Sequence, residues 1–283
     1  MADDRPVVSV VIPVRNEERR LPKCLDALWR QQGAPPFEVL VVDNGSADAT
    51  KDIASRHPIH ARVLTELLPG PYAARNTGIR AAEGEVVALT DADCVPGSNW
   101  LCEGVTALAA GADLVGGAIR QQSSDRPNMW ERYDRATYLR QEEFIVTESF
   151  AATANLFVRR EVFTRIGLFR PELRASGDLE FGQRATNAGY RLVFGDRAEV
   201  SHAPRATLRE TWALHRKLGS GFAELARAGL RGSPWSDPAL RFAVGVVAEQ
   251  VAENGPPIRR RRLTPYHLLA LAARWTGRLT GRG

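Results

Sequence analysis

Short apolar runs alternate with longer amphipathic segments along the first half of the chain. Four such runs occur, at residues 7–12, 37–42, 61–64 and 85–89. They are continuously apolar, as in strands that are buried on both faces of a parallel sheet. Residues 17–32 and 73–82 instead repeat apolar side chains at helical spacing. The alternation predicts successive β-α units in a mostly parallel α/β sheet flanked by helices.

The pattern changes after residue 111. Further strands are expected at residues 112–119, 153–158, 191–194 and 199–202, and further helices at residues 98–110, 128–145 and 178–188. From residue 207 the pattern is helical, with breaks at residues 232–238 and 254–257. We therefore predict one α/β domain over residues 1–205 and a helical extension over residues 206–283.

Charge is distributed unevenly along these 283 residues. The net charge is +5, yet residues 203–283 hold 14 Lys and Arg against 5 Asp and Glu, so the basic character belongs to the C-terminal third. The run Arg259 to Arg262 fits peripheral contact with an anionic membrane surface, and a solvated tail is the alternative. The first two-thirds are acidic and carry no recognisable nucleic-acid module, so we expect no nucleic-acid partner.

The sequence offers no membrane span or disulfide framework. The apolar runs at residues 242–247 and 268–273 are far shorter than the roughly 18–20 residues that a spanning helix needs. The N-terminus carries acids where a signal peptide would carry bases, so we expect a cytoplasmic protein, with contact to the inner membrane face left open. The three cysteines form no C-x-x-C pair, which argues against a zinc site.

Polar residues follow each of the first four predicted strands. Arg15, Asn16 and Glu17 follow the first strand, next to Pro13; Asp43 and Asn44 follow the second, Glu66 the third, and Asp91 and Asp93 the fourth. The carboxyl ends of parallel strands share one edge of a sheet, where ligands bind. Carboxylates gathered there repel one another unless a cation or a hydrogen-bonded ligand intervenes. The pattern predicts a divalent metal or a polyhydroxyl ligand.

Asp91-Ala92-Asp93 is the sharpest of these features. Two carboxylates at i and i+2 can share one hard cation, and oxygen ligands suit Mg²⁺ or Mn²⁺. The alternative is an Asx-turn that caps the helix at residues 98–110. Asp43, at the end of a buried strand, could accept hydrogen bonds from ribose hydroxyls or a base. Arg75 and Asn76 open a helix, and a helix start beside a cation suits an anionic ligand.

Four segments taken together resemble family 2 glycosyltransferases of the GT-A fold. They read VSVVIPVRN (8–16), VVDNGSADAT (41–50), ARNTGIRAAEG (74–84) and ALTDADC (88–94). The resemblance covers about residues 5–205 and continues in SGDLEFGQR (176–184), although many relatives carry Glu-Asp at the place of Gly177-Asp178. It implies a donor half over about residues 1–115, an acceptor half over about residues 116–205, and a helical basic C-terminal extension.

The resemblance also implies roles for the strand-end residues. Asp43 would bind the uridine of a UDP-sugar, and Asp91, Asp93 and His202 would hold Mn²⁺ or Mg²⁺ against the diphosphate. The remaining donor contacts would come from Pro13, Arg15, Asn16, Glu17, Asn44, Arg75, Asn76, Asp91 and Ala92. The implied activity is metal-dependent transfer of a hexose to a hydroxyl of an acceptor glycan, a lipid-linked sugar or a small compound.

The family inverts the anomeric centre in a single displacement, so one base must take the proton of the acceptor hydroxyl. Asp178 is the residue that the resemblance implies, and a helix N-cap is its structural alternative. Glu180 is a substitute that should point elsewhere because it lies two positions along the helix.

Three other functions compete with transfer. A dinucleotide-binding oxidoreductase fails because Pro-Val-Arg-Asn-Glu-Glu stands where G-x-G-x-x-G is needed. A haloacid-dehalogenase-like phosphatase would use Asp91 as its nucleophile, but that motif follows the first strand and three strands precede Asp91 here. A non-catalytic nucleotide-sugar-binding protein would keep Asp43 and the aspartate pair without needing Asp178.

Overall fold

The computed structural model describes residues 5–122, 124–230, 269 and 272–277, and it forms two compact units. The first unit comprises Met1–Asp125, Thr137–Glu172 and Gly177–Pro204. The second unit comprises Arg126–Ala136, Leu173–Ser176 and Arg205–Gly283, so it adds two short earlier segments to the C-terminal part of the chain. The division into functional domains stays a prediction.

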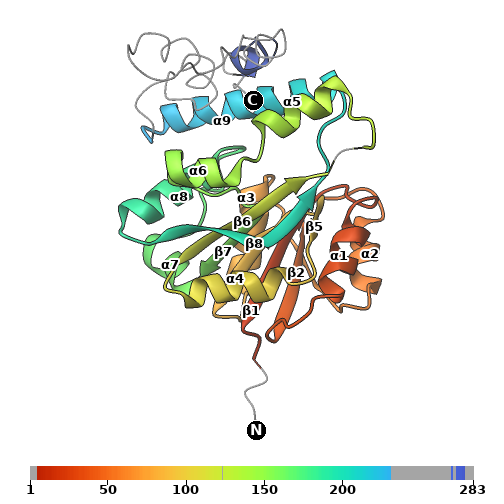
Figure 1. The fold of residues 1–283 in the computed structure, drawn as a ribbon, viewed down its shortest axis with the longest axis vertical. Coiled ribbons are helices and arrows are strands. Elements are labelled where there is room, and N and C mark those ends of the chain that lie inside the picture. The colour runs from red at the N-terminus through yellow and green to blue at the C-terminus, as the bar shows by residue number, and fades with distance from the viewer. Residues whose placement is uncertain (1–4, 123, 231–268, 270–271, 278–283) are drawn as a thin grey trace. The chain divides into compact units, whose positions relative to one another are not determined.

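The first unit is built on one sheet in the order β3-β2-β1-β4-β7-β6-β8-β5 (Figure 1). The strands are β1 (Val8–Val14), β2 (Phe37–Asp43), β3 (Arg62–Thr65), β4 (Val86–Thr90), β5 (Cys94–Pro96), β6 (Leu114–Gln121), β7 (Asn155–Arg159) and β8 (Leu192–His202). Strands β1 to β4 pair in parallel, as does β6 with β8, whereas β7 is antiparallel to both β4 and β6. The predicted α/β sheet is confirmed.

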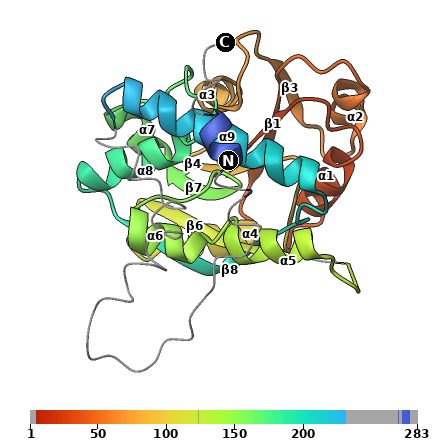
Figure 2. The same ribbon diagram turned by 90° about the horizontal axis from the view of Figure 1, so that it is seen from above.

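Helices cover both faces of this sheet (Figures 1 and 2). They are α1 (Leu21–Trp29), α2 (Thr50–Arg56), α3 (Pro71–Ala81), α4 (Trp100–Ala109), α6 (Gln141–Glu148), α7 (Arg160–Ile166) and α8 (Gly177–Asn187). Alternate residues of β1, such as Val10 and Ile12, share one core cluster with side chains of α1 and α4. Val11 faces the other way, against α3, where a Cβ on Gly78 would lie 2.4 Å from Val11 Cγ1. That glycine lets α3 approach the sheet closely.

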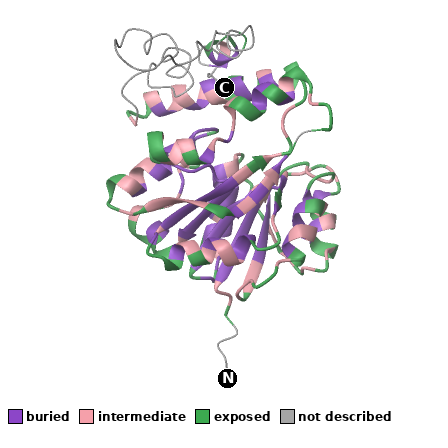
Figure 3. Cartoon of the chain, viewed as in Figure 1, coloured by how far each residue is buried: buried purple, intermediate pink, exposed green. Residues whose placement is uncertain are grey.

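The strands that carry the candidate site are almost entirely buried (Figure 3). One fully buried amide ties β7 to its neighbours, because Asn155 donates to the carbonyls of Ala118 and Ala198 at 2.8 and 2.7 Å. Its Oδ1 accepts the indole N–H of Trp100 at 2.8 Å. Buried polar groups are costly unless they are satisfied, so this network fixes the strand ends beneath the site.

Several expected elements differ in detail. The two short strands expected at residues 191–194 and 199–202 belong to one strand, β8. The register of β8 against β6 shifts between them, and the exposed Asp196 and Arg197 interrupt the apolar pattern there. The helix expected at residues 128–145 is two helices, α5 (Met129–Thr137) and α6, since Leu139 between them has a left-handed φ of 54°. Strand β5 and helix α7 were not predicted, because three and seven residues are too few to show a clear period.

The second unit contains α5, α9 (Leu208–Arg227) and the helical residues 272–277. Helix α9 begins with a capping box in which Thr207 and Glu210 exchange hydrogen bonds. Inside this unit the ring of His215 lies between the Tyr133 hydroxyl at 3.3 Å and Arg274 Nε at 3.1 Å. The predicted helix breaks and the run Arg259 to Arg262 lie outside the described residues. Among the described helices, none is long and apolar enough to cross a membrane.

Candidate active site

The loops after β1 and β2 are joined by hydrogen bonds at the carboxyl edge of the sheet. Val14 and Asp43 are in register at the ends of the two strands. Asn16, with a φ of 57° that asparagine tolerates, donates its N–H to Ser46 Oγ at 3.0 Å and accepts the Ala47 N–H at 2.8 Å. Pro13 is half-buried, while the Arg15 side chain is exposed at this edge. The two loops therefore form one pre-ordered rim.

Asp43 and Asn44 differ in what the protein already does with them. Asp43 is buried, and its carboxylate accepts the Ser46 N–H at 3.1 Å. The Asn44 amide donates to the carbonyls of Glu66 and Leu68 at 2.9 and 2.8 Å and accepts the Gly70 N–H at 2.8 Å. Asn44 thus ties the rim to the loop before α3, and its predicted contact with a donor stays a prediction.

The aspartate pair lies beside His202, far along the chain. Antiparallel pairing of β5 with β8 sets Cys94 opposite His202, so His202 Nε2 lies 3.4 Å from Asp93 Oδ2. Burial raises the pKa of the Glu17 carboxyl; Arg20 opposes this, and the charges of Asp93 and Asp91 add to the rise. The charges of Glu17, Asp91 and Asp93, all predicted as site residues from the sequence, therefore interact at this edge. Ala92 between the aspartates is buried.

The donor atoms here fit a hard divalent cation. Carboxylate oxygens and an imidazole nitrogen are suitable ligands for Mn²⁺ or Mg²⁺. His202 is buried, and within the described part of the chain its Nδ1 has no hydrogen-bond partner. One of the two ring nitrogens is therefore not satisfied by the protein. The same part of the chain contains no ready-made cluster of three or more His, Cys, Asp or Glu ligands. A cation would have to draw Asp91, Asp93 and His202 together.

Asp91 is linked to Asp178 by a continuous series of contacts. The buried Arg75 guanidinium forms an ion pair and a hydrogen bond with Asp91 Oδ1. Its carbon Cζ lies 5.5 Å from the centroid of the Tyr72 ring, within cation–π range. The Tyr72 hydroxyl in turn lies 3.3 Å from Asp178 Oδ1. Asp91, Arg75 and Asp178 were each predicted from the sequence, and the structure connects all three through a fourth residue, Tyr72.

Burial raises the pKa of the Asp178 carboxyl above its ordinary value. The Leu179 N–H, the charge of Arg75 and the Tyr72 hydroxyl each oppose that rise. The carboxyl lies in the first turn of α8, where a helix N-terminus favours negative charge. A partly desolvated carboxylate of this kind is suited to accept a proton.

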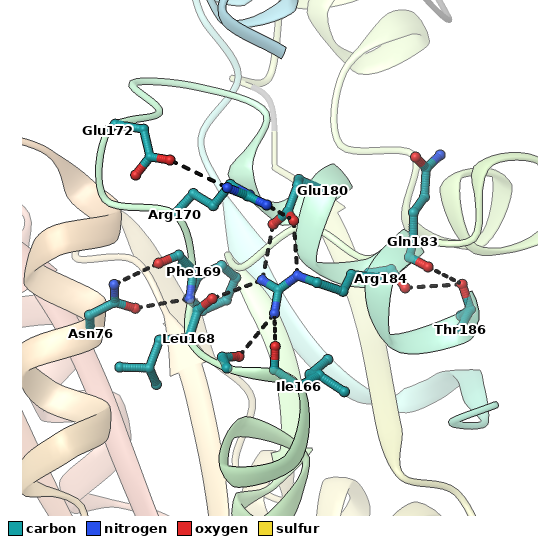
Figure 4. Close-up of polar contacts among 12 residues, drawn as sticks. Asn76, Ile166, Leu168, Phe169, Arg170, Glu172, Glu180, Gln183, Arg184 and Thr186 are labelled. Carbon is teal, nitrogen blue, oxygen red and sulfur yellow. Dashed lines mark hydrogen bonds and ion pairs between the residues drawn. The ribbon is translucent and has the colours of Figure 1, made fainter. Parts of the chain in front are cut away.

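Glu180, the substitute base in the sequence analysis, is fully engaged (Figure 4). Its carboxylate oxygens Oε1 and Oε2 accept hydrogen bonds from Arg184 at 2.9 and 3.0 Å, and Oε1 also accepts one from Arg170 at 3.1 Å. Figure 4 also shows Asn76, whose amide donates to the Phe169 carbonyl at 2.8 Å and accepts the Phe169 N–H at 3.1 Å. The amide of Asn76 is thus held by the backbone, and its predicted donor contact stays a prediction.

Tyr72 was not predicted as a site residue from the sequence. The signal available was its spacing, because residues 72 and 75 are one helical turn apart and face the same way on α3. Tyrosine at an apolar helical position looks like core, and its hydroxyl partner lies more than a hundred residues further on. Only the tertiary structure joins the two.

The comparison with protein families decides the identity. The model of glycosyl transferase family 2 matches residues 9–167, which is more than half of the chain. The chain belongs to glycosyl transferase family 2. It is 41% identical over 211 residues to glycosyltransferase AglE of Haloferax volcanii, covering 72% of this chain and 69% of AglE. It is also 31% identical over 241 residues to a pre-mycofactocin glycosyltransferase of Mycobacterium tuberculosis, covering 77% and 47% of the two chains.

Solved structures share the fold of this family 2 chain. The mannosyltransferase PcManGT from Pyrobaculum calidifontis, in complex with GDP-Man and Mn²⁺, superposes with a TM-score of 0.70 at 23% identity, covering 99% of this chain and 88% of that one. TarS of S. aureus with UDP-GlcNAc gives a TM-score of 0.51 at 21% identity, covering 97% and 90%. The predicted GT-A fold and glycosyltransferase class are confirmed. The phosphatase and non-catalytic alternatives have no support.

Proposed function

We propose that this glycosyltransferase moves a hexose from a nucleoside diphosphate sugar to an acceptor hydroxyl, with inversion of the anomeric centre. Asp178 would be the base and a divalent cation the cofactor. The observation that carries the proposal is the series Asp91, Arg75, Tyr72 and Asp178, which links the aspartate pair to a desolvated carboxyl. The donor class is supported by two structural relatives, whose complexes hold GDP-Man with Mn²⁺ and UDP-GlcNAc.

The donor would lie along the carboxyl edge of β1, β2 and β4. Asp43 would accept hydrogen bonds from the nucleoside, and the rim from Pro13 to Glu17 would line the base. Arg75 and the backbone at Ala92 would lie near the diphosphate. We assign Asn44 and Asn76 the task of holding the loops beneath the donor, because both side-chain amides are already bonded to backbone groups.

Asp91, Asp93 and His202 would hold Mn²⁺ or Mg²⁺. When bound, such a cation supplies positive charge that neutralises the charge developing on the leaving diphosphate. The protein's own contribution is Arg75, a buried cation already paired with Asp91. If Asp91 turned toward a metal, Arg75 would be released from that pair.

The chemical step needs one base and no enzyme nucleophile. The acceptor oxygen forms a bond to the anomeric carbon while the bond from that carbon to the diphosphate oxygen breaks. The hydroxyl proton passes to the Asp178 carboxylate, and the nucleoside diphosphate leaves with the bonding electron pair. The hydrogen bonds from Tyr72 and Leu179 to the Asp178 carboxylate both end on Oδ1, so Oδ2 would be the oxygen that takes the proton.

The acceptor would be a glycan, a lipid-linked sugar or a small hydroxyl compound, and the enzyme would be cytoplasmic with peripheral contact to the inner membrane face. Helix α9 supports such contact because Arg209, Arg216 and Lys217 are exposed along it beside Leu208. Binding to anionic vesicles should weaken when residues 257–283 are deleted. Unchanged binding would remove the arginine run from the anchor.

The test of the proposed function is a panel of UDP- and GDP-sugars with Mn²⁺, Mg²⁺ or EDTA, following release of nucleoside diphosphate. We expect metal-dependent release from one donor, and UDP remains the predicted nucleotide. Asp93→Ala should abolish release, whereas Asp196→Ala, which removes an exposed aspartate of β8, should not. No release from any donor would overturn the proposal, and equal release in EDTA would overturn its metal dependence.

A further inference from the structure

We propose that Tyr72 is a positioning residue, whose hydroxyl holds one oxygen of Asp178 so that the other faces the acceptor. The inference rests on the proposed function, because it concerns the same base. It assigns to α3 a part in orienting the acceptor-side carboxyl, besides its part in holding Arg75.

The hydroxyl contacts Asp178 at both ends of the residue. It donates to Oδ1 at 3.3 Å and accepts the Asp178 N–H, also at 3.3 Å. The Leu179 N–H donates to the same Oδ1 at 3.0 Å. One carboxylate oxygen is thus held by two donors while the backbone that carries it is held by the same tyrosine. This restrains the side-chain rotamer and leaves Oδ2 without a contact from either of these two donors.

The tyrosine ring is itself held firmly. Only 5% of Tyr72 is exposed, and its ring stacks on Phe169 at a centroid distance of 5.6 Å. Phe169 is in turn fixed through its backbone by the two hydrogen bonds of Asn76, one turn further along α3 (Figure 4). A hydroxyl on a buried, stacked ring loses little freedom when it orients a partner.

Gly177 provides a second, independent observation, the close packing of the Tyr72 ring against the backbone next to Asp178. A Cβ at position 177 would lie 2.7 Å from Tyr72 Cε2 and 2.8 Å from Cζ, closer than real Cβ atoms come. Any larger residue before Asp178 would therefore displace the ring and its hydroxyl. The Gly177-Asp178 pair and Tyr72 form one packing unit.

The groups around Asp178 determine in which direction its pKa moves when the Tyr72 hydroxyl is removed. Burial and the charge of Asp178 keep the pKa of Tyr72 well above its ordinary value, so the hydroxyl remains a donor near neutral pH. The Leu179 N–H, the charge of Arg75 and the Tyr72 hydroxyl all lower the pKa of Asp178 against the effect of burial. Loss of the hydroxyl should therefore raise the pKa of the base.

The experiment compares Tyr72→Phe with the wild-type full chain, using the best donor, acceptor and metal. Phenylalanine keeps the stacked ring and removes only the hydroxyl. We expect kcat to fall about 10- to 100-fold, the equivalent of one hydrogen bond to a charged group, while the KM for the donor stays the same. The acid limb of the pH profile of kcat should move to higher pH.

Tyr133→Phe is the matched control, because it removes a buried tyrosine hydroxyl that contacts His215 in the second unit. It should leave the acid limb in place. Gly177→Ala gives a second measurement, since its Cβ displaces the ring without removing the hydroxyl, and it should lower kcat and shift the limb in the same direction as Tyr72→Phe.

The outcomes separate the inference from the function beneath it. If the wild type transfers sugar, Asp178→Asn does not, and Tyr72→Phe keeps the wild-type kcat and acid limb, the role of Tyr72 is overturned while the proposed function stands. If the wild type transfers no sugar from any donor, both are overturned. A fall in kcat with an unmoved acid limb would reduce Tyr72 to packing and overturn the inference.

Discussion

Helix α8 carries two acidic side chains, Asp178 and Glu180, in surroundings of opposite character. Glu180 is 6% exposed in its side chain and is paired with two arginines. One of them, Arg184, also donates to the carbonyls of Ile166, Gly167 and Leu168 at the end of α7 (Figure 4). Asp178 has instead a neutral hydroxyl and a backbone N–H on one oxygen, and burial raises its pKa.

A carboxylate that stabilises the fold differs from one that takes part in a reaction in how fully the protein pairs its charge. In the Glu180 cluster the charges are matched and the donors are used, so the cluster joins α7 to α8 and has nothing left for a ligand. Around Asp178 the protein accepts an energetic cost from burial that its hydrogen bonds only partly offset. Desolvated acids that have no cation bonded directly to the carboxylate gather at functional sites.

The largest effect should separate the two acids in activity. Asp178→Asn should lower kcat by about 10²–10⁴-fold, because the amide cannot accept the acceptor's proton, while donor binding stays near that of the wild type. Glu180→Gln should retain most of its turnover. Nucleoside diphosphate release and donor titration by calorimetry measure the two quantities. If Glu180→Gln lost activity as severely as Asp178→Asn, the assignment of the base would be wrong.

The next effect should appear in stability, on the Glu180 side. Arg184→Met should lower the free energy of unfolding by about 2–3 kcal/mol, because it leaves a buried carboxylate with one counter-charge. This lies below the value for a fully buried pair because 25% of the Arg184 side chain is exposed. Urea unfolding measures it. Arg165→Met, an exposed arginine on the neighbouring α7, is the control and should change stability by less than about 0.5 kcal/mol.

The two sides of the comparison were not equally open to prediction from sequence. The β-α alternation and the acids after β1, β2 and β4 could be found because parallel strands bring their carboxyl ends together whatever the loops do. Asp178 was found through its motif. The partner that orients it could not be found, since the contact between Tyr72 and Asp178 depends on how α3 and α8 pack around Gly177.

The same limit applied to His202 and Glu180. His202 could be named as a ligand only through the resemblance, because strand β5, which brings it beside Asp93, has three residues and no periodic signal. Glu180 could be judged only by helical spacing, and its two arginine partners come from the loop after α7 and from α8 itself. Contacts that join distant short segments leave no local pattern.

The smallest effect concerns the stability of the Asp178 side, and its sign is the reverse of that at Arg184. Because burial raises the pKa of Asp178 above its value in the unfolded chain, the folded protein binds the proton more tightly than the unfolded chain. Stability from this group is complete below the unfolded pKa, about 3.9, and is lost as pH rises through the folded pKa.

Asp178→Asn should therefore be slightly more stable than the wild type at neutral pH, because the amide carries no charge to desolvate and its oxygen can still accept from Tyr72 and Leu179. Towards pH 4 the difference should vanish, since the wild-type carboxyl then becomes neutral too. Urea midpoints at a series of pH values measure this, with Glu180→Gln as the counterpart that gains nothing. A lower midpoint for Asp178→Asn at neutral pH would mean that its hydrogen bonds outweigh burial, and Asp178 would then resemble Glu180 as a structural acid.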